Sequence, residues 1–314
     1  MNLPSLSDIQ SAHSRIRPFI HFTPVMSSQQ LNKLFDCELF FKCENFQKVG
    51  AFKFRGATNA VLSLTDEEKR KGVVTHSSGN HAAALALAAR MNGVKANIVM
   101  PDNAPVVKKN AVAGYGAEIT FCKPTLQARE ENTRIIMERT GATLVHPYDN
   151  YNVICGQGTA ALELLEEKND LEIVVAPIGG GGLMSGTSTC VKGINKGILV
   201  IGAEPLNAND AFRSFTTGIL TPSVNPLTVA DGLLTSLSEL TFSIIRKNVD
   251  EILTVKEESI IECMLMIWER MKIIIEPSSA TVLAVIKENL EKFRGKKIGL
   301  IISGGNVDFR NLPF

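Results

Sequence analysis

Residues 41–56 read FKCENFQKVGAFKFRG and join an apolar, strand-like segment to the start of a predicted helix. Lys53 lies in this stretch between Phe52 and Phe54. A lysine held between aromatic rings near a helix start can have a lowered pKa, because desolvation disfavours the ammonium and frees the amine as a nucleophile or Schiff-base partner. Taken alone, an F-K-F pattern is more often an ordinary lysine whose alkyl stem packs on apolar neighbours. The rest of the chain decides between these two interpretations.

The bulk composition describes a chain that can bury a full core. It has 314 residues, of which 45% are apolar, so we expect two domains or one large α/β unit. Its 33 Lys and Arg residues against 32 Asp and Glu leave a formal charge of +1, which gives no field that favours nucleic acid or an anionic membrane. The longest run of small apolar residues, 82–89, is too short to span a bilayer. The expected partner is a small molecule.

Six cysteines lie in apolar surroundings and form no C-x-x-C pair. This pattern favours reduced thiols over a disulfide framework or a zinc site. Residues 1–20 carry scattered charges without a continuous apolar stretch, so they do not predict a secretory signal. We therefore expect a cytoplasmic protein.

Strands and helices alternate along most of the chain, and the charged segment 66–71 is expected to be a surface turn between them. Between residues 72 and 149 we expect strands at 72–76, 96–101, 117–122 and 143–146, with helices at 82–91, 105–115 and 125–140. After that we expect helices at 157–167, 183–194, 257–271 and 279–288, strands at 173–177, 199–203, 251–255 and 297–303, and a loop over 204–231. This rhythm is typical of parallel sheets with helices on both faces. It predicts a small domain, 72–149, inserted into a large domain made of 1–71 and 150–314.

Four consecutive glycines, Gly179 to Gly182, lie between a predicted strand and a predicted helix. Glycines let backbone N–H groups approach a phosphate, and the helix N-terminus adds a favourable potential for an anion. The spacing is neither the G-x-G-x-x-G of a dinucleotide loop nor the G-K-[ST] of an NTPase. It favours a monophosphate and argues against a Rossmann oxidoreductase, although a purely structural turn is also possible for this motif alone.

Two further turns follow predicted strands and carry polar side chains. Residues 77–81, SSGNH, lead into a helix and could bind a carboxylate or an aromatic hydroxyl, or could simply cap the helix. Residues 303–306, SGGN, follow the last strand and present a hydroxyl where parallel sheets bind ligands. The histidines show no metal-binding spacing.

Together these motifs resemble, nearly end to end, the fold-type II pyridoxal-phosphate enzymes of the serine/threonine dehydratase and serine racemase family. The matching motifs are KVGAFKFRG at 48–56, THSSGNH at 75–81, GQGT at 156–159, the four glycines, and SGGNVD at 303–308. The resemblance implies an α/β protein with the tryptophan synthase β-like fold. In that fold two parallel or mixed-sheet α/β domains are expected, with the smaller inserted in the larger.

The resemblance also implies which residues bind pyridoxal 5'-phosphate. They are Phe52, Lys53, Asn80, Gly179, Gly180, Gly181, Gly182, Leu183 and Ser303. Lys53 would carry the cofactor as a Schiff base and then remove the substrate's Cα proton. Ser303 would face the pyridine nitrogen, and a neutral hydroxyl there leaves the ring a weaker electron sink than a carboxylate would. Direct loss of a β-hydroxyl can then compete with formation of a full quinonoid carbanion.

Substrate contacts implied in the same way come from Ser77, Ser78, Gly79, Asn80, His81 and Arg129. Ser78 would stand across the cofactor plane from Lys53 as a second catalytic residue, which opens racemisation. The expected activity is β-elimination of L-serine or L-threonine to a 2-oxo acid and ammonia, together with interconversion of L- and D-serine. The alternative is a threo-3-hydroxyaspartate dehydratase or aspartate racemase, with Arg129 selecting the second carboxylate. A non-catalytic amino-acid-binding regulator would require loss of Lys53 or Ser303, and both are present.

Residues 203–210, AEPLNAND, match the cation loop of the racemase branch. By resemblance, the carboxylates of Glu204 and Asp210 and the carbonyl of Ala208 would bind a divalent cation (Mg, Mn or Ca), since hard cations prefer oxygen ligands. Two solvated loop acids are the alternative. The resemblance further implies a homodimer.

Overall fold

The computed structural model of the protein describes residues 3–77, 79–104 and 106–314. Its larger sheet has the strand order β1-β2-β10-β7-β8-β9, and neighbouring strands run parallel except β1 with β2. The strands are β1 (Val25–Met26), β2 (Glu38–Cys43), β7 (Ile173–Pro177), β8 (Leu199–Pro205), β9 (Glu251–Val255) and β10 (Lys297–Ile302). The sheet is therefore mixed through its short edge strand β1.

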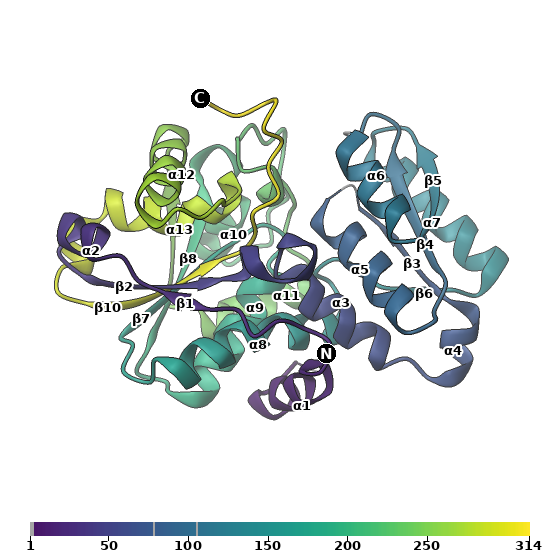
Figure 1. The fold of residues 1–314 in the computed structure, drawn as a ribbon, viewed down its shortest axis with the longest axis horizontal. Helices are drawn as coiled ribbons and strands as arrows, with labels where there is room; N and C mark the ends of the chain where they lie inside the picture. Colours follow the sequence, from purple (N-terminus) through teal and green to yellow (C-terminus); the bar gives the residue numbers. More distant parts are fainter. Residues whose placement is uncertain (1–2, 78, 105) are drawn as a thin grey trace.

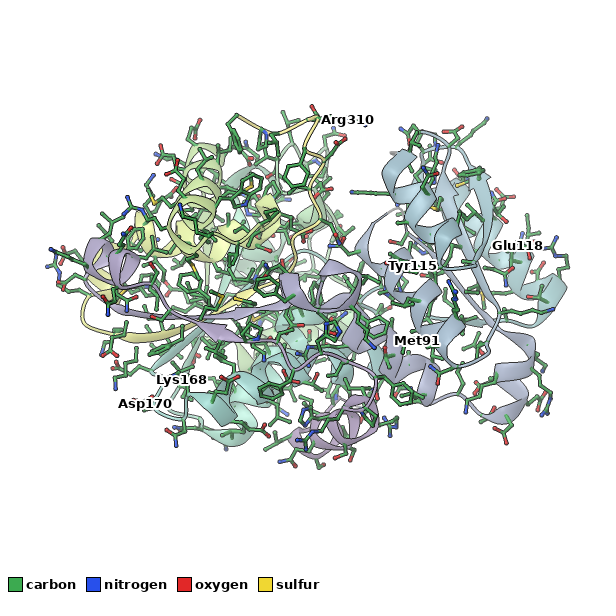
Figure 2. The ribbon with its side chains drawn as sticks, viewed as in Figure 1. Met91, Tyr115, Glu118, Lys168, Asp170 and Arg310 are labelled. Atoms are coloured by element: carbon green, nitrogen blue, oxygen red, sulfur yellow. The ribbon has the colours of Figure 1, made fainter. Side chains whose placement is uncertain are left out.

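The smaller sheet has the order β5-β4-β3-β6 and is parallel throughout. It consists of β3 (Val73–His76), β4 (Ala96–Pro101), β5 (Glu118–Cys122) and β6 (Thr143–Leu144). Figure 1 shows the two sheets in separate parts of the molecule, with the chain leaving the larger part after β2 and returning before β7. Figure 2 labels Tyr115 and Glu118 on the smaller part and Lys168 and Asp170 on the larger part. Both parts are α/β, as the sequence predicts.

Helices cover both faces of both sheets. They are α1 (Leu6–Ile16), α2 (Gln29–Phe35), α3 (Lys53–Leu62), α4 (Asp66–Lys71), α5 (Asn80–Met91), α6 (Val106–Gly114), α7 (Leu126–Thr140), α8 (Tyr151–Glu167), α9 (Gly182–Ile194), α10 (Asp210–Thr217), α11 (Glu239–Asn248), α12 (Glu257–Met271), α13 (Pro277–Glu288) and α14 (Leu290–Phe293). None of the helices described is long and apolar enough to cross a membrane.

The core explains this layering. Every residue of β7 is buried, because α2, α12 and α13 pack on one face of the larger sheet while α1, α8, α9 and α11 pack on the other. In the smaller sheet, α5 and α3 cover one face and α7 covers the other. Strands buried on both faces read as continuous apolar runs, which is the pattern that the sequence shows.

Three of the sequence-based element assignments were wrong. Helix α8 begins at Tyr151 instead of residue 157, because the side chain of Asn150 caps it by accepting the N–H of Val153. The expected loop 204–231 contains helix α10. The charged segment 66–71, expected as a surface turn, is helix α4, which a capping box between Thr65 and Glu68 stabilises.

Candidate active site

Lys53 is the first residue of α3 and lines a cavity of about 460 Å³ between the two parts of the molecule. Its Nζ donates a hydrogen bond to the carbonyl oxygen of Pro147 at 2.9 Å and lies 5.0 Å from the centre of the Phe52 ring. Burial of the ammonium lowers the pKa of Lys53 to about 8. The negative charge of Glu276 acts in the opposite direction and raises that pKa, but by less. The amine is therefore available near neutral pH.

The four glycines connect β7 to α9 and border the same cavity. Gly181 has φ of 84°, which favours glycine, and a Cβ on Gly180 would lie 2.3 Å from the ring of Tyr148. A Cβ on Gly182 would lie 2.7 Å from Oε1 of Gln157. Side chains are thus excluded from this turn, which leaves its backbone N–H groups and the N-terminus of α9 beside the cavity as an anion cradle.

Gln157, from α8, is fully buried beside this cradle. Neither polar atom of its side-chain amide has a hydrogen-bond partner within the described residues. Unpartnered buried amides are costly and uncommon in native structures. An anion or an ordered water at the cradle would satisfy this group.

The turn between β3 and α5 supplies Ser77, Gly79, Asn80 and His81 to the cavity wall. Ser78 lies outside the described residues. Nε2 of His81 pairs with the carbonyl oxygen of Val145 at 2.9 Å, and burial lowers the pKa of His81 to about 3. His81 is thus a neutral histidine whose described polar contact is structural.

Asn80 is held by residues from the far end of the chain. Its Nδ2 donates to the two carboxylate oxygens of Glu276 at 3.2 and 3.0 Å, and its Oδ1 accepts a hydrogen bond from Asn306 at 2.9 Å. These contacts fix the orientation of the Asn80 amide at the cavity wall. The sequence predicts that Asn80 is a site residue, but not these two partners.

Glu276 is one of the cavity residues that sequence reasoning missed. It precedes α13, is 4% exposed and borders the cavity. Burial raises the pKa of Glu276 to about 7, and the hydrogen bond from Asn80 only partly opposes this. A glutamate before a proline at a helix start is a common local pattern, so the sequence carries no signal that it faces Lys53.

Ser303 follows β10, is 3% exposed and lines the cavity. Its carbonyl oxygen accepts the N–H of Phe52 at 2.9 Å, so the end of β10 is bonded directly to the segment that carries Lys53. Residues from opposite ends of the sequence are thereby fixed side by side at the carboxyl edge of the larger sheet.

Arg129, on α7, and Tyr148 also border the cavity. The ring of Tyr148 packs edge-on against His146, with centroids 4.6 Å apart. Burial, followed by the charge of Arg129, lowers the pKa of His76, and burial lowers the pKa of His146 to about 4. Among these four side chains, Arg129 is therefore the one that carries a charge to offer a substrate.

The predicted cation ligands lie together but outside this cavity. Both carboxylate oxygens of Glu204 accept backbone N–H groups, from Ala211 and Phe212, at 2.8 Å each. Oδ2 of Asp210 is buried without a hydrogen-bond partner among the described residues. Burial raises the pKa of Glu204 to about 8 and that of Asp210 to about 6. No group of three or more His, Cys, Asp or Glu side chains suited to a metal ion occurs in the described part of the chain.

Comparison with known proteins identifies the family. Residues 16–304 match the model of the family described as "Pyridoxal-phosphate dependent enzyme". The chain belongs to this family. It is an enzyme that uses pyridoxal phosphate, as the motifs predict.

Individual relatives are similar over nearly their whole length. The chain is 52% identical to a serine racemase of Dictyostelium discoideum over 98% of this chain and 96% of that protein. It is 49% identical to a beta-hydroxyaspartate dehydratase of Paracoccus denitrificans, over the full length of both. Among solved structures, a threonine deaminase from T.th. matches with a TM-score of 0.93 and 43% identity, covering 98% of this chain and 99% of that one. The fold-type II assignment is thereby confirmed.

The residues around the cavity fit pyridoxal phosphate. The cradle of Gly179 to Gly182 admits no side chain and suits a phosphate, and the orphaned amide of Gln157 lies against it. Lys53 supplies an amine with a lowered pKa for the cofactor's aldehyde. Asn80 and Ser303 supply polar atoms to the same cavity.

Proposed function

We propose that the protein catalyses β-elimination of L-serine and L-threonine to a 2-oxo acid and ammonia, and that it also interconverts L- and D-serine. The observation that carries the proposal is the amine of Lys53, whose pKa is lowered to about 8 within a cavity that also contains an anion cradle. Relatives of about half identity, named as racemase and dehydratase, support it.

Bound pyridoxal phosphate supplies the electron sink that acidifies the substrate's Cα–H. Lys53 would bind the cofactor covalently through Nζ and, once the substrate's amine has taken its place, would accept the Cα proton at the same atom. A pKa near 8 suits this task, because roughly a tenth of the amine is then unprotonated at pH 7, far more than at the ordinary lysine pKa. The β-hydroxyl would then leave the substrate, and hydrolysis of the elimination product would yield the 2-oxo acid and ammonia.

The remaining cavity residues would bind and orient. The amides of Gly179 to Gly182 and of Leu183 would hold the phosphate, and Phe52 would pack on the ring. Asn80, fixed by Glu276, would bind the ring's 3-hydroxyl. The turn 77–81 would bind the substrate carboxylate at the N-terminus of α5.

Ser78 is our candidate for the second proton-transfer residue, on the strength of the sequence alone. The test is to follow pyruvate and D-serine together from L-serine, with the native protein and with Ser78→Ala. We expect D-serine from the native protein only, and pyruvate from both. Pyruvate without D-serine in either protein would reduce the function to that of a dehydratase, and absence of both products would refute the proposal.

A second candidate function is elimination from threo-3-hydroxyaspartate, or racemisation of aspartate. Arg129 in the cavity wall favours it, because a guanidinium there could bind a second carboxylate. Rates with serine, threonine, hydroxyaspartate and aspartate should be compared for the native protein, for Arg129→Met and for the control Arg134→Met, whose side chain pairs with Glu138 on the exposed face of α7. A selective loss of hydroxyaspartate turnover in Arg129→Met would support this function over the first.

We also propose that a divalent cation (Mg, Mn or Ca) binds Glu204, Asp210 and the carbonyl of Ala208. Two buried carboxylates lie close together there, and neither forms an ion pair within the described residues; a cation with retained waters would neutralise them. Magnesium should raise the thermal midpoint of the native protein but not that of Glu204→Gln. The exposed Glu239→Gln serves as the control.

Residues 72–149 are proposed to form the small domain, and 1–71 with 150–314 the large domain. The smaller sheet packs in apolar clusters that also take in residues of α3, and Lys108 pairs with Asp231 at 2.8 Å beside the cavity, which supports closure of one part on the other. We propose a homodimer located in the cytoplasm. Light scattering and cell fractionation test these two points.

A further inference from the structure

A second serine hydroxyl lies directly behind Ser303. Ser279, in the first turn of α13, is fully buried and does not border the cavity. Its Oγ lies 2.9 Å from Oγ of Ser303, and within the described residues this is the one hydrogen-bond partner of the Ser303 hydroxyl. Ser303 is therefore positioned between Ser279 and the cavity.

Ser279 has more hydrogen-bond partners than it has protons. Its Oγ accepts the N–H of Gly304 at 2.8 Å, and it lies 2.8 Å from the carbonyl oxygen of the same residue. That carbonyl also accepts the N–H of Glu276 at 3.0 Å, so it remains bonded whichever way the Ser279 proton points. The single proton of Ser279 can therefore go either to Gly304 or to Ser303 without leaving a buried group unpaired.

These two arrangements give Ser303 opposite roles at the cavity. If Ser279 donates to Gly304, Ser303 donates to Ser279 and presents only lone pairs to the cavity. If Ser279 donates to Ser303, the proton of Ser303 points into the cavity. A protonated ring nitrogen needs the first arrangement and an unprotonated one needs the second.

We propose that Ser279 is a positioning residue which sets the direction of the Ser303 hydroxyl and lets it act as donor or acceptor to the cofactor's ring nitrogen. This rests on the proposed function, in which Ser303 faces that nitrogen. Ser279 itself touches neither cofactor nor substrate. Its effect passes entirely through Ser303.

A double-mutant cycle on the holoenzyme tests this dependence. Pyridoxal-phosphate affinity and the NMR signal of ¹⁵N in the ring of bound, labelled cofactor are measured for the native protein, Ser279→Ala, Ser303→Ala and the double variant. We expect each single variant to weaken cofactor binding about ten-fold, since each loses one buried hydrogen bond. The ¹⁵N signal should move in Ser279→Ala, whereas adding Ser279→Ala to Ser303→Ala should change neither readout.

The matched control is Thr281→Val, which removes another fully buried hydroxyl of α13, one that donates to the carbonyl of Ser278. It should leave the ¹⁵N signal unchanged. Ser279→Cys keeps the side-chain size with weaker hydrogen bonds, so it should move the signal in the same direction if Ser279→Ala fails to fold.

Additive losses in the double variant, or an unchanged ¹⁵N signal in both Ser279 variants, would overturn the assignment of Ser279 alone. If the native protein forms no borohydride-reducible bond to the cofactor at Lys53, the proposed function fails, and this assignment fails with it.

Discussion

Lys53 and Arg55 lie two residues apart on the same helix, yet their side chains belong to two different kinds of buried charged site. Arg55 points into the interior, where it contacts Glu44 at 2.7 Å and Glu163 at 2.7 Å. Lys42 joins the same group through Glu163 at 2.6 Å. All four side chains are fully buried or nearly so, and every charge has an opposite partner.

Pairing drives the pKa values of Glu163 and Arg55 away from neutrality. Burial alone would raise the pKa of Glu163, but the close approach of His13, the hydrogen bonds from Arg55 and the charges of Arg55 and Lys42 outweigh it and lower that pKa to about 2. Burial alone would lower the pKa of Arg55, but Glu44 and Glu163 raise it. Glu163 and Arg55 therefore remain charged at any physiological pH, and this ion-pair cluster is structural.

The cavity charges behave in the opposite way. Burial lowers the pKa of Lys53 to about 8 and raises the pKa of Glu276 to about 7, because neither group forms a close ion pair within the described part of the chain. Both groups can change protonation near neutral pH, as proton transfer requires. The charges of both regions are buried, so burial does not distinguish them. What separates the structural charges from those that can transfer protons is ion pairing.

The largest effect should come from Lys53→Ala. We expect turnover of serine to fall at least about 1,000-fold, because the substitution removes both covalent attachment and proton transfer. Steady-state kinetics measures this, with Lys48→Ala from the same segment as the control. A Lys53 variant with a tenth of native turnover would mean that another group is the base.

Arg55→Met should destabilise the protein by disrupting the paired buried charges. It leaves Glu44 and Glu163 buried without their main partner, so we expect a loss of about 3–5 kcal/mol in the free energy of unfolding. Urea denaturation measures it. The exposed Arg134→Met should cost less than about 1 kcal/mol, because its ion pair with Glu138 lies in solvent. Equal losses in the two variants would contradict the distinction between paired and unpaired burial.

The pH dependence of stability should have opposite signs in the two regions. The lowered pKa of Glu163 stabilises the fold above about pH 4.5, and this contribution is lost as the pH falls toward 2. The raised pKa of Glu276 does the reverse: its contribution is present at low pH and is lost as the pH rises from about 4.5 through 7.

Urea midpoints measured from pH 4.5 to 8 therefore test the sign for Glu276. Stability of Glu276→Gln relative to the native protein should increase with pH, by at most about 1.4 kcal/mol per unit. Glu163→Gln should be destabilised throughout this range. A Glu276→Gln curve parallel to the native one would show that this carboxylate does not titrate there.

The smallest effect should come from Lys108→Ala at the cavity mouth. Its ion pair with Asp231 is partly exposed, so we expect an increase in KM of about two- to five-fold with little change in kcat. Lys109→Ala, on the same helix, is the control and should leave KM unchanged. If kcat falls instead of KM rising, this ion pair contributes to the chemical step.

The sequence alone located part of the cavity wall. Lys53, Gly179 to Gly182 and Ser303 each follow a strand of the larger sheet, and Asn80 follows one of the smaller sheet. Parallel strands place such residues together at their carboxyl ends, so local patterns suffice to find them. The sequence also predicted the buried strands, as in β7, which is apolar at every position.

Only the tertiary structure decided which groups face one another. Glu276 meets Asn80 from 196 residues away, and the carboxylate of Glu204 lies at the N-terminus of α10, where it binds the N–H groups of Ala211 and Phe212 in a segment that the sequence predicts to be a loop. Hydrophobic periodicity encodes whether a residue is buried, but it does not encode its partner across the core. A charge's pKa depends on that partner and on the surrounding burial, so the chemistry of Glu276 could be read only from the folded chain.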